Sequence, residues 1–258
     1  MKDVVAESLC FSLSDQAERA RWQMANIPWD RIDRSRATEP LRALVREIAF
    51  SELTTTSATR RFLDELSDDT DFTQWISVWF FEETRHPQIM LRWLHEVGVH
   101  VDDGFLRRGR ATAPFMKSRF GTLVTNVISE MVASTSYAAL HATVDEPVLA
   151  AIARNLAGDE ARHAASFYAY AQRYLQRSSD PVADRRDALK VVYLWFHDNV
   201  RHPVSEFFAR NDAPPGADLA ELRTRILQVI GSLVGVPLDA NTDLLAQVRD
   251  LGQQGVVR

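Results

Sequence analysis

The stretch Phe81-Glu82-Glu83-Thr84-Arg85-His86 indicates the fold, because a near copy, Gly158-Asp159-Glu160-Ala161-Arg162-His163, follows later in the chain. Each stretch has an acidic pair, one spacer residue and then Arg-His, so that a Glu stands three residues before a His. On a helix this spacing puts both side chains on one face, a single turn apart. Two such turns that face each other would bring together two carboxylates and two imidazoles.

Two lone glutamates, Glu52 and Glu130, repeat the same registry. Glu52 precedes Glu83 by 31 residues, and Glu130 precedes Glu160 by 30. A Glu-x-x-His turn alone is more often a solvated helix face, so the repeated registry carries the interpretation. Two helix hairpins, each with Glu on its first helix and Glu-x-x-His on its second, match the ligand plan of ferritin-like bundles that hold two metal ions. The predicted metal ligands are Glu52, Glu83, His86, Glu130, Glu160 and His163.

Apolar periodicity predicts the helices that carry these ligands. Four long helices are expected over 38–66, 71–97, 114–142 and 147–177. Pro87 predicts a kink in the second of them, Gly98 ends it, and Pro147 starts the fourth. Shorter helices are expected over 13–25, 182–210, 217–234 and 240–253. The fold class is therefore all-α: a ferritin-like four-helix bundle with a di-metal centre and additional N- and C-terminal helices.

The chain is expected to fold around one large domain. Residues 1–36 are interpreted as an N-terminal extension that includes a short helix capped by Ser14. Residues 37–210 form the helical bundle with a fifth helix, interrupted near Pro203. Residues 211–258, after a linker at 212–216, form a C-terminal helical appendage packed on the same domain. The connection 98–113 is long enough to cross over the end of a bundle.

Composition limits the function classes. The net charge of −5 does not favour nucleic-acid binding. The single Cys10 excludes an internal disulfide and an all-cysteine iron–sulfur cluster, so any electrons must come from a separate protein or a small reductant. The first residues lack the apolar core of a signal peptide, and no run approaches the roughly 20 apolar residues of a membrane span. A cytoplasmic location without a membrane span is expected.

Four carboxylates on apolar helix faces need compensating charge, because burying each one costs on the order of several kcal/mol. Two divalent cations would balance them. Iron or manganese suits a mixed oxygen and imidazole shell, whereas zinc usually takes four ligands. Asp159 and Glu82 each directly precede a motif glutamate and are expected to orient the ligand histidines from behind. The alternative for Glu82 is a surface partner of Arg85.

Other polar and aromatic residues allow two interpretations each. Ser134, one turn after Glu130, either assists oxygen handling as a tentative catalytic residue or packs. Tyr137 is more often core than redox relay, as are Phe167, Tyr170 and the tryptophans. His141 lies about 16 Å along the helix from Glu130, too far to share a metal ion. Candidate residues for receiving electrons are Trp22, Trp29 and Asp159. A basic cluster is either a solvated loop or a docking patch for an acidic partner: Arg107, Arg108, Arg110, Lys117 and Arg119.

The sequence resembles the soluble acyl-[acyl-carrier-protein] desaturases over about residues 38–210. The resemblance rests on Trp79 to Leu91, on Asp159 to His163 and on the later stretch Trp195 to Phe208. It implies that Glu83 and Glu160 bridge two metal ions, while Glu52 with His86, and Glu130 with His163, hold one ion each. The family has a threonine three residues after the third-helix glutamate. That position is Ala133 here, with Ser134 and Thr135 as the nearest hydroxyls.

The resemblance implies an oxygen-dependent di-iron oxidoreductase that attacks C–H bonds of a fatty acyl chain carried on acyl carrier protein. It implies two iron ions that cycle between Fe2+ and Fe3+, with manganese as the alternative, an external electron donor such as ferredoxin, and a homodimer. Two other functions remain open from the ligands alone. One is a di-iron hydroxylase or N-oxygenase of a small-molecule pathway, and the other is a ferritin-like iron-oxidising or storage protein.

Overall fold

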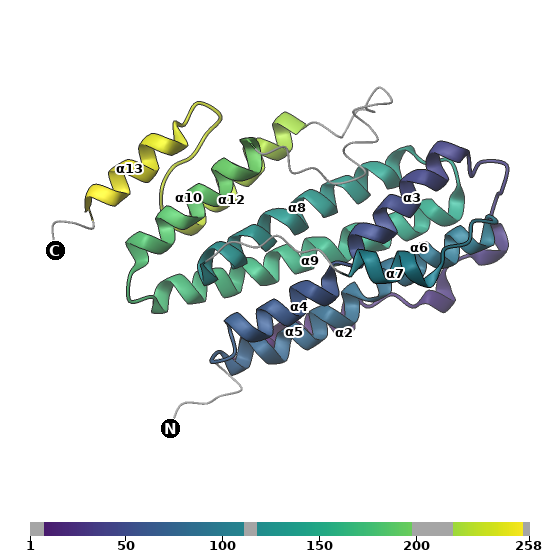
Figure 1. Cartoon of the computed structure of the whole chain (residues 1–258), viewed down its shortest axis with the longest axis horizontal. Helices are drawn as coiled ribbons and strands as arrows, with labels where there is room; N and C mark the ends of the chain where they lie inside the picture. Colours follow the sequence, from purple (N-terminus) through teal and green to yellow (C-terminus); the bar gives the residue numbers. More distant parts are fainter. Residues whose placement is uncertain (1–7, 111–117, 198–218, 255–258) are drawn as a thin grey trace. The chain divides into compact units, whose positions relative to one another are not determined.

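The computed structural model describes residues 8–110, 118–197 and 219–254, and within these ranges the regular structure is helical, without a β-strand. The helices, labelled in Figure 1, are α2 (Leu9–Ala20), η1 (Met24–Asn26), η2 (Trp29–Arg31), α3 (Glu39–Glu52), α4 (Thr55–Glu65), α5 (Thr70–Glu83), α6 (Arg85–Glu96), α7 (Asp103–Gly109), α8 (Arg119–Thr143), α9 (Pro147–Arg177), α10 (Pro181–His197), α12 (Leu219–Val234) and α13 (Leu244–Gln254). None of the described helices is both long and apolar enough to cross a bilayer.

The described residues divide into two units, and the long helices α8 and α9 each run through both. The first unit holds 8–110 and 134–160, and the second holds 118–133, 161–197 and 219–254. The domain boundaries expected near residues 37 and 211 stay a prediction. Several sequence expectations fall outside the described residues: the start of the third helix and Lys117, the part of the fifth helix beyond His197 with Pro203, and the linker 212–216.

The first long helix is interrupted, which the sequence analysis did not foresee. Instead of one helix over 38–66, α3 ends at Glu52 and α4 begins at Thr55. Thr54 N donates to Ser51 O at 3.0 Å, a tighter turn than the α-helix, and Thr55 Oγ1 donates to Glu52 O at 2.7 Å. Hydroxyl side chains that bond to backbone carbonyls compete with the helical ladder. The predicted ligand Glu52 therefore stands at the break.

The second long helix is also broken, as Pro87 predicts. α5 ends at Glu83, α6 begins at Arg85, and Pro87 is the third residue of α6. Proline has no N–H to donate to the carbonyl four residues earlier, that of Glu83, and its ring crowds that carbonyl. The predicted kink is thus confirmed. It separates Glu83 and His86 onto the two sides of the break.

Two shorter elements differ from expectation. α2 begins at Leu9 rather than near residue 13, because Ser8, not Ser14, caps it by accepting from Phe11 N at 3.3 Å. The connection after Gly98 is partly helical, since Asp102 accepts from Phe105 N at 2.7 Å and starts α7. By contrast, α9 spans Pro147–Arg177, and the predicted fourth helix is confirmed at both ends.

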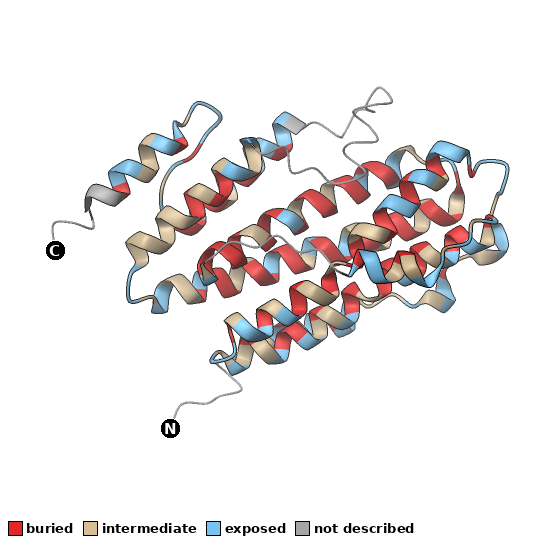
Figure 2. Ribbon diagram, in the orientation of Figure 1, coloured by how far each residue is buried: buried red, intermediate tan, exposed pale blue. Residues whose placement is uncertain are grey.

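The core of the first unit is aromatic. Phe62 of α4 makes edge contacts with Phe72 and Trp79 of α5, with ring centroids 5.7 and 5.5 Å apart. Trp93 of α6 and Ile48 of α3 are fully buried where those two helices pack together. Burying each such side chain contributes about 1.5–3 kcal/mol. Figure 2 shows the buried residues as stripes along individual helices.

In the second unit α10 packs against α12 and α13. Its contribution to the core includes Leu189 and Val192, and α12 contributes Ile226 and Ile230. Phe120 at the start of α8 stacks on Tyr174 near the end of α9, with centroids 5.8 Å apart. Apolar packing therefore stabilises the C-terminal helices α10 and α12.

Candidate metal centre

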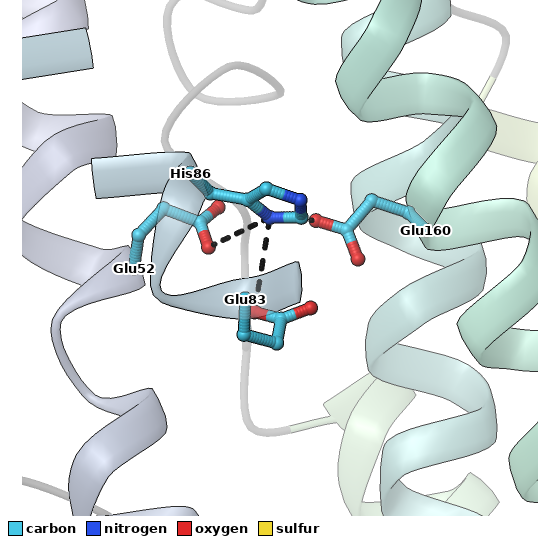
Figure 3. Close-up of side chains that lie close together, drawn as sticks. All are labelled: Glu52, Glu83, His86 and Glu160. Atoms are coloured by element: carbon cyan, nitrogen blue, oxygen red, sulfur yellow. Dashed lines mark ion pairs between the residues drawn. The ribbon is translucent and has the colours of Figure 1, made fainter. Parts of the chain in front are cut away.

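Four of the six predicted ligands meet inside the first unit (Figure 3). They are Glu52 at the end of α3, Glu83 at the end of α5, His86 in the first turn of α6 and Glu160 in α9. One ligand atom from each lies within 4.8 Å of the others, and none of the four residues is more than 8% exposed. Side chains from distant parts of the sequence thus form a buried cluster of donor atoms.

The cluster is arranged around one imidazole nitrogen. His86 Nδ1 lies 3.7 Å from Glu52 Oε2, 3.8 Å from Glu83 Oε2 and 3.3 Å from Glu160 Oε1. Three carboxylates beside one imidazole form a mixed oxygen and nitrogen donor set of the kind that iron and manganese accept. The residues therefore fit a divalent ion of that type.

The electrostatics of His86 show how strongly this site attracts positive charge. Burial by itself lowers the pKa of His86, but the negative charges of Glu83 and Glu160 and a hydrogen bond with Asp159 outweigh it. The pKa of His86 is therefore held well above its ordinary value. Buried carboxylates require a cation, either a proton on His86 or a metal ion in its place.

Asp159 lies behind the histidine of the other motif. Its Oδ2 is 3.2 Å from His86 Nε2, and the same oxygen accepts a hydrogen bond from Trp22 Nε1 at 2.7 Å. The Arg85 guanidinium sits 4.0 Å over the Trp22 ring and donates to the Trp22 carbonyl. Asp159 is fully buried and Trp22 half-buried, so polar contacts connect the cluster with a partly exposed indole.

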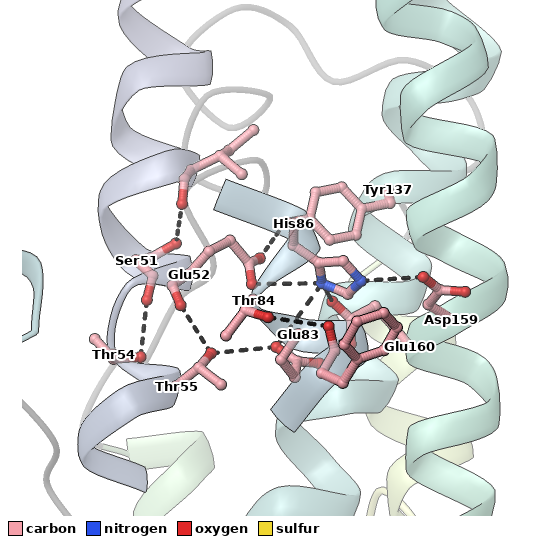
Figure 4. A network of polar contacts seen from close by, with 12 residues as sticks. Ser51, Glu52, Thr54, Thr55, Glu83, Thr84, His86, Tyr137, Asp159 and Glu160 are labelled. Carbon is pink, nitrogen blue, oxygen red and sulfur yellow. Dashed lines mark hydrogen bonds and ion pairs between the residues drawn. The ribbon is translucent and has the colours of Figure 1, made fainter. Parts of the chain in front are cut away.

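Two hydroxyl groups touch the carboxylates, and the sequence analysis assigned neither to the site (Figure 4). Tyr137 OH donates to Glu52 Oε1, and Thr55 Oγ1 lies 3.3 Å from Glu83 Oε2. Burial raises the pKa of Tyr137 well above its ordinary value, and the charges of Glu52 and Glu160 raise it further, so the phenol stays neutral. A usable signal was present, since a buried tyrosine on an apolar stripe needs a partner for its hydroxyl.

Of the remaining predicted site residues, Glu82, Glu130 and His163 are also buried. Glu130 on α8 and His163 on α9 belong to the second unit. Glu82 is 2% exposed, so it does not lie on the surface beside Arg85. Ser134 is half-buried and donates to Ala157 O at 2.9 Å. The metal-ligating roles of Glu130 and His163, the orienting roles of Glu82 and Asp159, and the catalytic role of Ser134 stay predictions.

Other candidates lie apart from this cluster. His141 is exposed, with Nδ1 2.9 Å from Ala150 O. Trp29 donates to Met24 O at 3.0 Å and lies under the Arg92 guanidinium. Arg107 on α7 is exposed and pairs with Asp103 of the same helix at 2.5 Å. Of the candidate residues for receiving electrons, Trp22 and Asp159 are thus the two in contact with the site.

Several solved structures with a similar fold are variants of an R2-like ligand-binding oxidase. One, with a non-activated Mn/Mn cofactor after aerobic reconstitution with Mn and Fe, gives a TM-score of 0.64 at 17% identity over 89% of this chain and 93% of that chain. Another, with an aerobically reconstituted Mn/Fe cofactor, gives 0.60 at 16% identity over 91% and 97%. These likenesses confirm the predicted fold class, an all-α, ferritin-like helical bundle.

The comparison with curated proteins found no match. The family described as fatty acid desaturase matches residues 44–189, a range that contains all six predicted ligands. This match confirms the resemblance inferred from the two Glu-x-Arg-His motifs. Since it covers more than half of the 258 residues, the chain belongs to the fatty acid desaturase family.

Proposed function

We propose that this protein is an oxygen-dependent di-metal oxidoreductase that desaturates a fatty acyl chain presented on an acyl carrier protein. The observation that carries the proposal is the buried cluster of Glu52, Glu83, His86 and Glu160, whose ligand atoms lie within 4.8 Å of one another. Membership of the fatty acid desaturase family supports the substrate class.

The cofactor is proposed to be two iron ions, with manganese as the alternative. The R2-like oxidases of similar fold carry Mn/Fe or Mn/Mn cofactors. Glu52 and His86 would hold one ion, Glu130 and His163 the other, and Glu83 and Glu160 would bridge them. Helical periodicity supports His163 as a ligand, since it follows Glu160 by one turn on the continuous helix α9.

The proposed desaturation consumes one molecule of oxygen for each double bond formed. A saturated –CH2–CH2– segment loses two hydrogen atoms and becomes –CH=CH–, while O2, two electrons and two protons are converted with those hydrogens into two molecules of water. Bound metal ions would supply the activation of oxygen. The electrons would come from an external donor such as ferredoxin, because one cysteine cannot form an iron–sulfur cluster within the chain.

The residues of the chain have three tasks in this scheme. The buried carboxylates and His86 hold the ions away from water. Asp159 fixes the orientation of His86 through Nε2, an arrangement that tunes a metal-bound histidine. Trp22, partly exposed and hydrogen-bonded to Asp159, provides a route by which electrons reach His86. A homodimer and a docking role for the exposed arginines of α7 belong to the same proposal.

The test is a single-turnover reaction. Protein loaded anaerobically with ferrous ions is mixed with stearoyl-acyl carrier protein and then with oxygen. The mass of the acyl product is measured by mass spectrometry. The proposal expects a product lighter by two hydrogens, absent from a Glu83→Ala, Glu160→Ala control. Unchanged substrate from the fully loaded parent across acyl chain lengths would contradict the proposed desaturation.

The same experiment tests a second candidate, a hydroxylase or N-oxygenase of small molecules. The similarity of its fold to that of an R2-like ligand-binding oxidase supports this candidate. It expects a product heavier by one oxygen atom, formed from a free substrate rather than from the carrier-bound chain. Offering carrier-bound and free acyl chains side by side separates the two candidates, and a cage-sized particle in solution would indicate iron storage instead.

A further inference from the structure

Tyr137 contacts the proposed metal ligand Glu52 in a way that its packing does not require. The residue is fully buried in the part of α8 that belongs to the first unit, where a phenylalanine ring would fill the same space. Its hydroxyl donates to Glu52 Oε1. A buried hydroxyl without a partner costs about 1–3 kcal/mol, and Glu52 supplies a partner for this one.

The hydrogen bond distinguishes the two oxygens of Glu52. Oε1 accepts from Tyr137, whereas Oε2 faces the cluster, 3.7 Å from His86 Nδ1 (Figure 4). A carboxylate binds a metal ion through one oxygen or through both. Binding through both would require Oε1 to give up or share a strong hydrogen bond, because a bond to a charged acceptor is about twice as strong as a neutral one.

A second hydrogen bond holds the backbone of Glu52. Glu52 stands at the break between α3 and α4, and its carbonyl accepts from Thr55 Oγ1 at 2.7 Å. Thr55 therefore holds the backbone carbonyl of Glu52, and Tyr137 holds one oxygen of its carboxylate. This arrangement leaves Oε2 as the oxygen that faces the other donor atoms.

We propose that Tyr137 is a positioning residue that restricts Glu52 to binding a metal ion through Oε2 alone. The inference rests on the proposed function, since it needs a metal ion at this cluster. Its consequence is that one coordination position, which a chelating Glu52 would fill, stays open to a small molecule. Tyr137 thereby sets how many sites at that ion are accessible.

The test compares the full-length protein with Tyr137→Phe, each loaded anaerobically with Mn2+ for crystallography and with Fe2+ for near-infrared magnetic circular dichroism. In the parent, Glu52 is expected to bind through Oε2 with Oε1 on Tyr137. In Tyr137→Phe, Glu52 is expected to bind through both oxygens, and the coordination number of one ferrous ion rises by one. Tyr174→Phe, which removes a hydroxyl from a ring stacked on Phe120, is the matched control and leaves the spectrum unchanged.

Three results would overturn the inference. One is a chelating Glu52 in the loaded parent, which is decisive even if Tyr137→Phe fails to fold. Another is a one-oxygen Glu52 that persists in Tyr137→Phe with full metal content. The third is a parent that takes up neither Mn2+ nor Fe2+; this contradicts the proposed function itself, and the role of Tyr137 falls with it.

Discussion

The indole Nε1 of Trp22 donates a hydrogen bond of 2.7 Å to Asp159, although the two residues are 137 positions apart in the sequence. The oxygen that accepts it also lies 3.2 Å from His86 Nε2. A half-buried residue between α2 and η1 is thus connected to a candidate metal ligand through one buried carboxylate. Such a connection is useful to a site that must receive electrons from another protein.

Replacing Trp22 by Phe tests this connection. The ring can still pack under the Arg85 guanidinium, but the N–H that reaches Asp159 is lost. We expect metal content to be unchanged and the reduction of the oxidised site by an external donor to slow by about 10–100-fold, the size of the activity loss that is typical when partners of metal ligands are removed. Stopped-flow absorption measures that rate. Trp29→Phe is the control, since Trp29 donates to Met24 O and not to the site; equal slowing in both variants would contradict a specific route.

Asp159→Asn removes the charge behind His86 without changing the side-chain volume. The carboxylate helps to keep the pKa of His86 high and lies within hydrogen-bond distance of His86 Nε2. We expect Mn2+ affinity to fall by roughly 10–100-fold, as is usual when the partner of a ligand histidine is lost. Equilibrium titration of the metal-free protein measures it. Asp15→Asn, exposed on α2 and paired with Arg19, should bind Mn2+ like the parent.

The burial of like charges makes a prediction about stability. Glu83 and Glu160 are 4% and 1% exposed and both lie near His86 Nδ1. In Glu83→Ala, Glu160→Ala, metal uptake should disappear, yet the metal-free variant should unfold at the same urea concentration as the metal-free parent or a higher one. Replacing buried ionic groups by apolar groups of similar volume is often neutral or stabilises a fold by about 1–4 kcal/mol, which here offsets the cavity that alanine leaves. A metal-free variant that is clearly less stable would show that these carboxylates support the fold rather than a ligand.

His86 makes the metal-free protein sensitive to pH. Its folded-state pKa is raised, so the stabilisation it provides is complete below the unfolded pKa, about 6.5, and is lost as pH rises through the folded value. The free energy of unfolding of metal-free protein should therefore fall as pH rises above about 6.5. Mn2+ affinity should rise over the same window, because the proton on His86 must leave. Urea titrations and Mn2+ titrations between pH 6 and 9 check both signs, and His95→Asn, at an exposed position, serves as control.

Sequence reasoning predicted the parts of this site that depend on helical spacing. Glu83 and His86 stand one turn apart as expected, Pro87 breaks the helix, and α9 runs from Pro147 to Arg177. The break after Glu52 was missed because Ser and Thr hydroxyls that bond to carbonyls leave no mark on the apolar pattern. The contact of Tyr137 with Glu52 joins residues 85 positions apart, and no local pattern specifies such a pair.

Glu146 connects three segments of the first unit, the unit that holds the cluster. This buried carboxylate precedes Pro147 and accepts three hydrogen bonds: from Trp93 Nε1 and Leu149 N at 2.7 Å each, and from Asp33 N at 3.0 Å. It therefore joins α6, the start of α9 and the loop after η2. Glu146→Ala leaves two buried donors and one part-buried donor without this partner, and each lost bond to a charged group is worth about 1.5–3 kcal/mol, partly offset by relaxation. We expect the free energy of unfolding to fall by roughly 3–5 kcal/mol in urea denaturation.

Asp145→Ala, at the exposed neighbouring position, is the control and should change the free energy of unfolding by less than about 0.5 kcal/mol. A double-mutant cycle with Trp93→Phe isolates the indole contact, and a coupling energy near zero would show that Glu146 acts only as the cap of α9.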